Sequence, residues 1–202
     1  MTRFRRHLVL AATVFAAGAS LTACGGGSDA ATKPADLAGG TITPRQTAPP
    51  IALRDYQGKP VTLAEHRGKV VLLTFLYTHC PDVCPLIAGN LRVVQNELKD
   101  KARDVVMLAV STDPRGDTPR TVSKFLRDHR MAGRMDYLIG SPAQLRPVWK
   151  RWSIAARPGK KGLVAHSSLV YGISPKGKLI SIYPANFAPA DIVHDVPILE
   201  NL

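Results

Sequence analysis

Two cysteines, Cys80 and Cys84, lie four positions apart in the segment FLYTHCPDVCPL, which spans residues 75–86. Thiols at this spacing can hold each other in a disulfide, a metal ion, or the sulfur of a substrate. Four residues of a helix rise about 6 Å, which lies within the range of Cα separations that a disulfide spans. In the reduced state, the same pair presents two soft sulfur donors to one metal ion. The spacing leaves the redox and the metal hypotheses open.

The start of the chain indicates export. A basic segment, MTRFRRH, precedes the apolar segment LVLAATVFAAGASLTA, and together they predict a signal peptide over residues 1–23. The apolar run is shorter than the roughly 20 residues of a membrane-spanning helix. The tetrad LTAC, which ends at Cys24, resembles a bacterial lipobox, and this resemblance implies cleavage before Cys24 and a lipid on its thiol. We expect an exported protein that is lipid-anchored in the bacterial cell membrane, with its domain facing the periplasm or extracytoplasmic space.

The composition behind Cys24 predicts a tether followed by one domain. Residues 24–46 are rich in Gly, Ala, Ser, Thr and Pro without hydrophobic periodicity, which is typical of a flexible linker. Residues 47–202 have the length of one ordinary domain. The formal charge is +12, and removal of three arginines with the signal leaves +9. Export excludes nucleic acid as the partner of this charge and leaves anionic lipid or an acidic protein, although most of these cations are interpreted as solvated surface.

The domain alternates apolar strands and amphipathic helices. Continuous apolar runs predict buried strands over residues 70–78, 104–112 and 135–140. Apolar residues at spacings of four, three and four predict one helix face: Ile87, Leu91, Val94 and Leu98. Further helices are predicted over residues 118–130 and 141–154, the latter with Ser141 as its cap and Pro147 as a residue that kinks or shortens it.

Two hairpins and a last helix complete this pattern. Residues 166–184 predict two strands around the turn SPKG, and residues 51–69 predict a smaller hairpin with Gly58 at its turn. The order strand, helix, strand, helix, hairpin, helix is an α/β order. With a cysteine pair at the junction of the first buried strand and its helix, it resembles a thioredoxin-like fold with an N-terminal hairpin extension. Backbone amides at a helix start favour thiolate over thiol, so this position makes the pair reactive.

Four motifs in this order resemble the Sco/SenC family of copper-binding assembly proteins. They are Cys-x-x-x-Cys-Pro at residues 80–85, VSTDPRGDTP at 110–119, HSS at 166–168 and SPKGK at 174–178. The resemblance implies a domain that binds one copper, as Cu(I) or Cu(II), through two thiolates, Cys80 and Cys84, and one histidine, His166. It also implies that the protein serves the dicopper centre of cytochrome c oxidase, with oxidase subunit II or another copper-receiving client as partner. The family often has an acid before that histidine where this chain has Ala165, a difference that bears on tuning of the copper rather than on ligation.

Several neighbouring residues have simpler structural interpretations. Asp82 is interpreted as a helix cap and Asp117 as a turn and cap residue, whereas Asp113 is given a supporting part beside the copper loop. His79 directly precedes Cys80, and we interpret its side chain as pointing away from the metal. Three further histidines are interpreted as surface residues: His66, His129 and His194. Two tryptophans are interpreted as core residues: Trp149 and Trp152.

The sequence is compatible with two classes of function. One is a copper chaperone without turnover of its own and so without catalytic residues. The other is a membrane-tethered thiol–disulfide oxidoreductase, in which Cys80 and Cys84 form the redox pair that keeps client cysteines reduced. A peroxidase is excluded because the cysteine segment lacks the Thr-rich pocket that such an enzyme needs. We prefer the chaperone.

Overall fold

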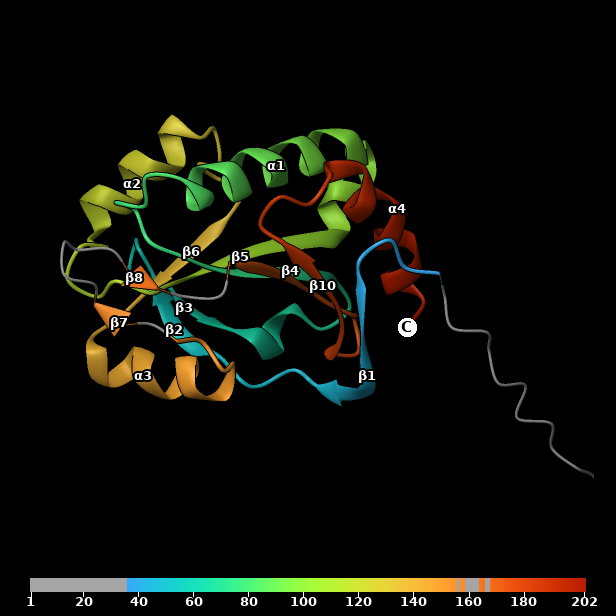
Figure 1. The fold of residues 1–202 in the computed structure, drawn as a ribbon, viewed down its shortest axis with the longest axis horizontal. Coiled ribbons are helices and arrows are strands. Elements are labelled where there is room, and N and C mark those ends of the chain that lie inside the picture. Colours follow the sequence, from blue (N-terminus) through green and yellow to red (C-terminus); the bar gives the residue numbers. More distant parts are fainter. Residues whose placement is uncertain (1–35, 156, 159–163, 166–167) are drawn as a thin grey trace, which may run out of the picture. The chain divides into compact units, whose positions relative to one another are not determined.

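A mixed β-sheet with helices on both faces forms the framework of the chain (Figure 1). The computed structural model describes residues 36–155, 157, 158, 164, 165 and 168–202. The strands are β1 (Gly40–Thr47), β2 (Ala52–Asp55), β3 (Pro60–Thr62), β4 (Val70–Leu76), β5 (Val105–Ser111), β6 (Asp136–Ile139), β7 (Arg157–Pro158), β8 (Val164–Ala165), β9 (Leu169–Ile173) and β10 (Lys178–Pro184). The helices are α1 (Val83–Leu98), α2 (Pro119–Asp128), α3 (Pro142–Arg151) and α4 (Pro189–Glu200), with short 3-10 turns η1 (Leu63–His66) and η2 (Lys99–Asp104).

The main sheet has the strand order β1-β10-β9-β4-β5-β6-β2-β3. Strands β4, β5 and β6 run parallel, and the strands on either side of them join in antiparallel pairs. All seven residues of β4 are buried, because parallel strands joined by helices are covered on both faces. The predicted α/β, thioredoxin-like order is confirmed, including the hairpin of β2 and β3 around Gly58, whose φ is +88°.

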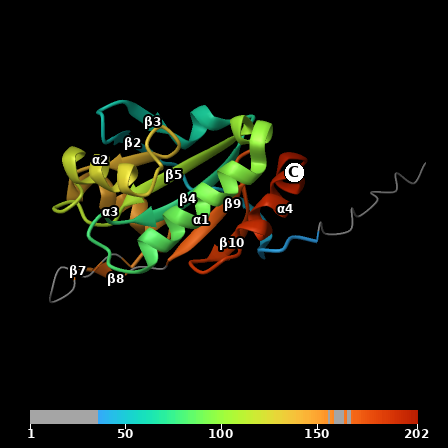
Figure 2. The same ribbon diagram turned by 90° about the horizontal axis from the view of Figure 1, so that it is seen from above.

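The helices cover the two faces of the sheet unequally. Helices α1, α2 and α4 lie on one face and α3 on the other (Figures 1 and 2). The predicted apolar face of α1 is confirmed, since its four residues are buried in the apolar core that also takes in residues of α2 and α4. Trp149 and Trp152 lie in a separate apolar core with other residues of α3, as predicted. Ser141 caps α3 through the amide of Gln144, and Pro147 lies inside this helix, which continues to Arg151.

The predicted tether differs from the structure at its end. Residues 40–47 form strand β1, which pairs with β10, so a strand of the sheet lies before the predicted domain boundary at residue 47. Seven of the eight residues of β1 are exposed, and its register shifts between Thr41 and Gln46. An edge strand of this kind carries no alternation of apolar and polar residues. Its sequence, GTITPRQT, therefore looked like linker.

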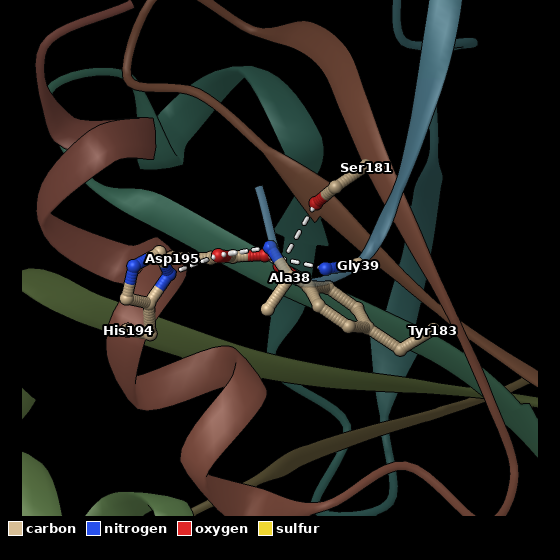
Figure 3. A network of polar contacts seen from close by, with 6 residues as sticks. All are labelled: Ala38, Gly39, Ser181, Tyr183, His194 and Asp195. Carbon is tan, nitrogen blue, oxygen red and sulfur yellow. Dashed lines mark hydrogen bonds and ion pairs between the residues drawn. The ribbon is translucent and has the colours of Figure 1, made fainter. Parts of the chain in front are cut away.

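A buried carboxylate fixes the chain just before β1 (Figure 3). Asp195, on α4, is fully buried and accepts hydrogen bonds from the backbone amides of Ala38 at 2.8 Å and Gly39 at 2.9 Å. The hydroxyl of Tyr183 donates to the same carboxylate at 2.8 Å, and Nδ1 of His194 lies 2.8 Å from it. A side chain at Gly39 would overlap the ring of Tyr183, so only glycine allows this close approach. Asp195 thus joins the N-terminal segment to the last helix.

Candidate metal centre

The two predicted sulfur ligands lie where β4 leads into α1. Neither of these cysteines forms a disulfide, and both are buried, Cys80 at 7% and Cys84 at 0% exposure. Cys84 is the second residue of α1, and its backbone amide donates to Sγ of Cys80 at 3.3 Å. Asp82 occupies the N-cap position, but its carboxylate makes no capping hydrogen bond. The predicted capping role of Asp82 is therefore wrong: the sulfur of Cys80 takes up a helix amide in its place.

The surroundings make the two sulfurs chemically unequal. A hydrogen bond from the Cys84 side chain lowers the pKa of Cys80 to about 5; the backbone amides of Asp82 and Cys84 and the Tyr77 side chain add to this, and burial opposes it. The pKa of Cys84 is raised, first by its hydrogen bond to Cys80 and then by burial. These opposite shifts favour the thiolate at Cys80 and the thiol at Cys84. A thiolate is the form that binds soft metals and attacks disulfides.

The predicted third ligand, His166, lies outside the described residues, as does Cys24. Strand β8 ends at Ala165, directly before His166, and pairs with β7. Both views show β8 at the same end of the main sheet as the start of α1 (Figures 1 and 2). In the described part of the chain no three His, Cys, Asp or Glu side chains are grouped closely enough to hold a metal ion. The ligand set stays a prediction.

His79 and Asp113 lie side by side next to the cysteine loop. A Cβ added at Gly116 would contact the carboxylate of Asp113 and lie 2.9 Å from Nδ1 of His79. That nitrogen is also 3.3 Å from the Thr78 hydroxyl. Asp113 therefore lies near His79 of the cysteine loop, and its supporting part at the copper stays a prediction.

Asp117 has a different role from the one predicted. Thr118, not Asp117, caps α2 through the amide of Thr121. Asp117 is buried and accepts hydrogen bonds from the Thr78 amide at 2.8 Å, the Ser111 hydroxyl at 2.6 Å and the Tyr137 hydroxyl at 3.1 Å. Burial raises the pKa of this carboxyl, and the three donors oppose the rise. The sequence carried no signal for the cluster, because its members come from four separate segments.

A pocket of about 310 Å³ opens beside Cys80. It is lined by loop and α1 residues Thr78, His79, Cys80 and Pro85, and by Thr121, Lys124, Phe125, Asp128 and His129 from α2 and its end. The ring of His129 packs on Phe125 with centroids 4.5 Å apart. Burial lowers the pKa of His129. Its predicted surface position is therefore only partly correct.

The two other histidines predicted at the surface also make contacts. His194 is 57% exposed and pairs with Asp195. Burial lowers the pKa of His66, and its Nε2 is buried without a hydrogen-bond partner in the described part of the chain. The surface interpretation of His66 is only partly correct, because its side chain is 13% exposed.

Comparison with known proteins identifies the family. The family model described as SCO1/SenC matches residues 40–199. The chain belongs to the SCO1/SenC family. Its Sco relatives include yeast mitochondrial SCO2 (Saccharomyces cerevisiae), which is 33% identical over 145 residues, or 68% of this chain and 48% of that protein. The chain thus spans about half the length of this curated relative.

Two solved Sco structures have the same fold. The copper-bound ScoI of Bradyrhizobium japonicum is 30% identical, with a TM-score of 0.67 over 76% of this chain and 99% of that one. BsSco, described as a member of the Sco family of cytochrome c oxidase assembly proteins in work on a disulfide switch, is 26% identical. Its TM-score is 0.67 over 78% of this chain and 95% of that one. Among the described residues of this Sco protein, no helix has the length and apolar character needed to cross a membrane.

Proposed function

We propose that this protein is a copper chaperone that binds one copper through Cys80, Cys84 and His166 and supplies the dicopper centre of cytochrome c oxidase. The observation that carries the proposal is the pair of buried cysteines at the start of α1, where the Cys84 amide donates to the sulfur of Cys80. Thiolates are the donors that Cu(I) selects, and an added imidazole also suits Cu(II). The copper-bound Bradyrhizobium relative and the assembly role described for the Sco family support the choice of metal and client.

Copper is the cargo in this proposal, and the chain's own groups explain how it is held and released. Cys80 offers a thiolate without prior loss of a proton, whereas Cys84 must release its proton on binding. Cys80 lines the pocket and Cys84 does not, so a client that carries competing ligands would reach the site from the side of Cys80. Oxidase subunit II, or another client whose cysteines take copper, fits this mode of release.

Anchoring in the membrane is part of the proposal. The lipobox-like tetrad ending at Cys24 supports a mature chain that begins with a lipidated cysteine and stays with the bacterial membrane, its domain on the extracytoplasmic side. Intact-mass measurement of the purified mature protein tests this, with a diacylated or triacylated Cys24 as the expected product. A secreted, lipid-free product that starts at or beyond residue 25 would contradict it.

A second function, thiol–disulfide reduction, is favoured by one observation. A low-pKa thiolate at Cys80 paired with a protonated Cys84 is the arrangement of an attacking and a resolving cysteine. Because client cysteines must be reduced before they take copper, the same pair can serve both tasks.

Replacing His166 by Ala separates the two functions. A reductase needs only its two sulfurs, so the variant should retain its disulfide-reduction rate. A copper site loses one of three ligands, so the affinity for copper should fall, most of all for Cu(II), which prefers imidazole. The measurements are copper stoichiometry, sulfur-to-copper charge-transfer absorption and disulfide reduction on the same samples. Unchanged copper binding by the variant, with efficient disulfide turnover by the wild type, would replace the chaperone by the reductase.

A further inference from the structure

The segment that carries Cys80 is a short loop, residues 77–82, between the end of β4 and the start of α1. Cys84 is held by helix α1, whereas Cys80 is on the loop. Both sulfurs can bind one metal ion only if the loop holds Cys80 in a fixed position relative to Cys84. The backbone amide of Thr78, two residues before Cys80, donates to Oδ1 of Asp117 at 2.8 Å. This bond links the cysteine loop directly to the segment between β5 and α2.

The acceptor of that bond is itself held from two other strands. Oδ2 of Asp117 accepts from the hydroxyl of Ser111, the last residue of β5, at 2.6 Å, and from the hydroxyl of Tyr137, on β6, at 3.1 Å. Ser111 is fixed in turn, since its carbonyl accepts from the indole N–H of Trp149 at 2.9 Å. Ser111, Asp117 and Tyr137 are all buried, at 0%, 4% and 0% exposure. These contacts fix the position of the Asp117 carboxylate, and its hydrogen bond to Thr78 fixes the Thr78 amide relative to it.

We infer that Asp117 is a positioning residue for the copper site: it holds the cysteine loop so that Cys80 and Cys84 present their sulfurs to one metal ion. This inference rests on the proposed function. Asp117 acts through the Thr78 amide and Cys80 rather than as a ligand. Residues that orient metal ligands in this way typically contribute a factor of about 10 to 100 to metal affinity.

The structure offers a matched control in Asp195. Like Asp117, it is a buried aspartate that accepts backbone and tyrosine hydroxyl donors: the amides of Ala38 and Gly39 and the hydroxyl of Tyr183. It lies on α4, pairs with His194 and binds the segment before β1. Removing either carboxylate leaves buried donors without an acceptor and should lower stability. Only the removal of Asp117 should also disturb the cysteine loop.

The test compares Cu(I) affinity and sulfur-to-copper charge-transfer absorption in reduced wild type, Asp117→Ala, Asp117→Asn and Asp195→Ala. We expect Asp117→Ala to bind Cu(I) about 10 to 100 times more weakly, with an altered charge-transfer band. Asp117→Asn keeps an oxygen acceptor for the Thr78 amide, and the two hydroxyls can turn to accept from its NH₂ group. It should stay within about threefold of wild type, as should Asp195→Ala.

Other results of these measurements would refute either the positioning role of Asp117 or the proposed function. Wild-type affinity in Asp117→Ala, or an equal loss in Asp195→Ala, overturns the inference because stability alone then explains the data. If Asp117→Asn loses as much Cu(I) affinity as Asp117→Ala, the charge of Asp117 rather than its positioning of the loop explains the effect, and the inference is overturned. If Asp117→Ala does not fold, Ser111→Ala replaces it; we expect a loss of about three- to tenfold, and no loss refutes the inference. A wild type that binds no copper refutes the proposed function instead.

Discussion

Replacing Cys84 by Ala should raise the pKa of Cys80. In the wild type the Cys84 side chain is the largest cause of the fall in the pKa of Cys80 from 9.0 to about 5. The variant loses this donor but keeps the amide of residue 84, which lies 3.3 Å from the Cys80 sulfur, and that of Asp82. We expect the pKa to rise by one unit or more and to stay below 9, since the helix start still favours the thiolate.

The size of the effect appears in the pH dependence of alkylation rather than in its rate at neutral pH. With a pKa of about 5, about 99% of Cys80 is thiolate at pH 7, against about 1% for a thiol with the ordinary value. A thiolate of low pKa is also a weaker nucleophile, by a factor of about 40 for four pKa units, so the two effects nearly cancel. The half-maximal pH is therefore the quantity that discriminates.

The assay is iodoacetamide alkylation of the reduced, metal-free protein between pH 4 and 10, with the site identified by peptide mass. Wild type should show a midpoint near pH 5 for Cys80 and little reaction at Cys84. Cys84→Ala should shift the Cys80 midpoint upward. A wild-type midpoint of 8 to 9, or a midpoint that does not move in the variant, would refute the assignment of thiolate and thiol.

The same shift predicts how the stability of the reduced protein depends on pH. The folded-state pKa of Cys80 lies below its unfolded value, so ionisation stabilises the fold. The contribution is complete above about pH 9 and is lost progressively as the pH falls to about 5. The contribution is favourable at pH 7, and Cys84→Ala should have a smaller acid dependence over this window. Denaturant unfolding at pH 5, 7 and 9 measures this difference.

Three further predictions follow from contacts elsewhere in the chain and from the sulfur pair. Asp195→Ala leaves the buried Tyr183 hydroxyl and the partly buried amides of Ala38 and Gly39 without their acceptor and should lower the free energy of unfolding by about 2 to 3 kcal/mol, with faster hydrogen exchange at residues 38–39; a loss below about 1 kcal/mol would contradict this. Gly177 has a φ of +71° and lies against the Arg67 guanidinium, so Gly177→Ala should destabilise the protein by about 1 to 2 kcal/mol. Gly89 lies on α1 in open space, so Gly89→Ala should stabilise the protein by about 0.5 to 1 kcal/mol. Equal shifts of the melting temperature in the two variants would be inconsistent with the structure. Oxidation of the cysteine pair removes both thiolate donors and should abolish tight copper binding, as isothermal titration of reduced and oxidised samples would show; equal binding would exclude the proposed ligand set.

The central fold was predictable because its signals are local. The continuous apolar run that became β4 and the spacing of Ile87, Leu91 and Leu98 on α1 each fix an element from neighbouring residues alone. The location of Cys80 and Cys84 between these two elements followed directly. Strand β1 lacked such a signal, since its pairing with β10 uses backbone groups and leaves most of its side chains exposed.

The fine structure of the site was not predictable, because it depends on contacts between distant residues. Asp117 looked like a turn residue next to Thr118, and only the fold brings Thr78, 39 positions earlier, to its carboxylate. The cap of α1 was assigned to Asp82 because aspartate is a common cap, but the sulfur of Cys80 accepts the amide instead.

The attachment of residues 38–39 to Asp195 has a consequence for the height at which copper is offered above the bilayer. The described chain begins at the end of the sheet opposite the start of α1, where the cysteines lie (Figures 1 and 2). With a lipid on Cys24, the 14 residues from Cys24 to Leu37 can separate the domain from the membrane by at most about 50 Å. If the proposed anchor holds and the tether is extended, the cysteine end would face away from the membrane, and a client in the same membrane would have to present its copper-receiving residues well above the lipid headgroups.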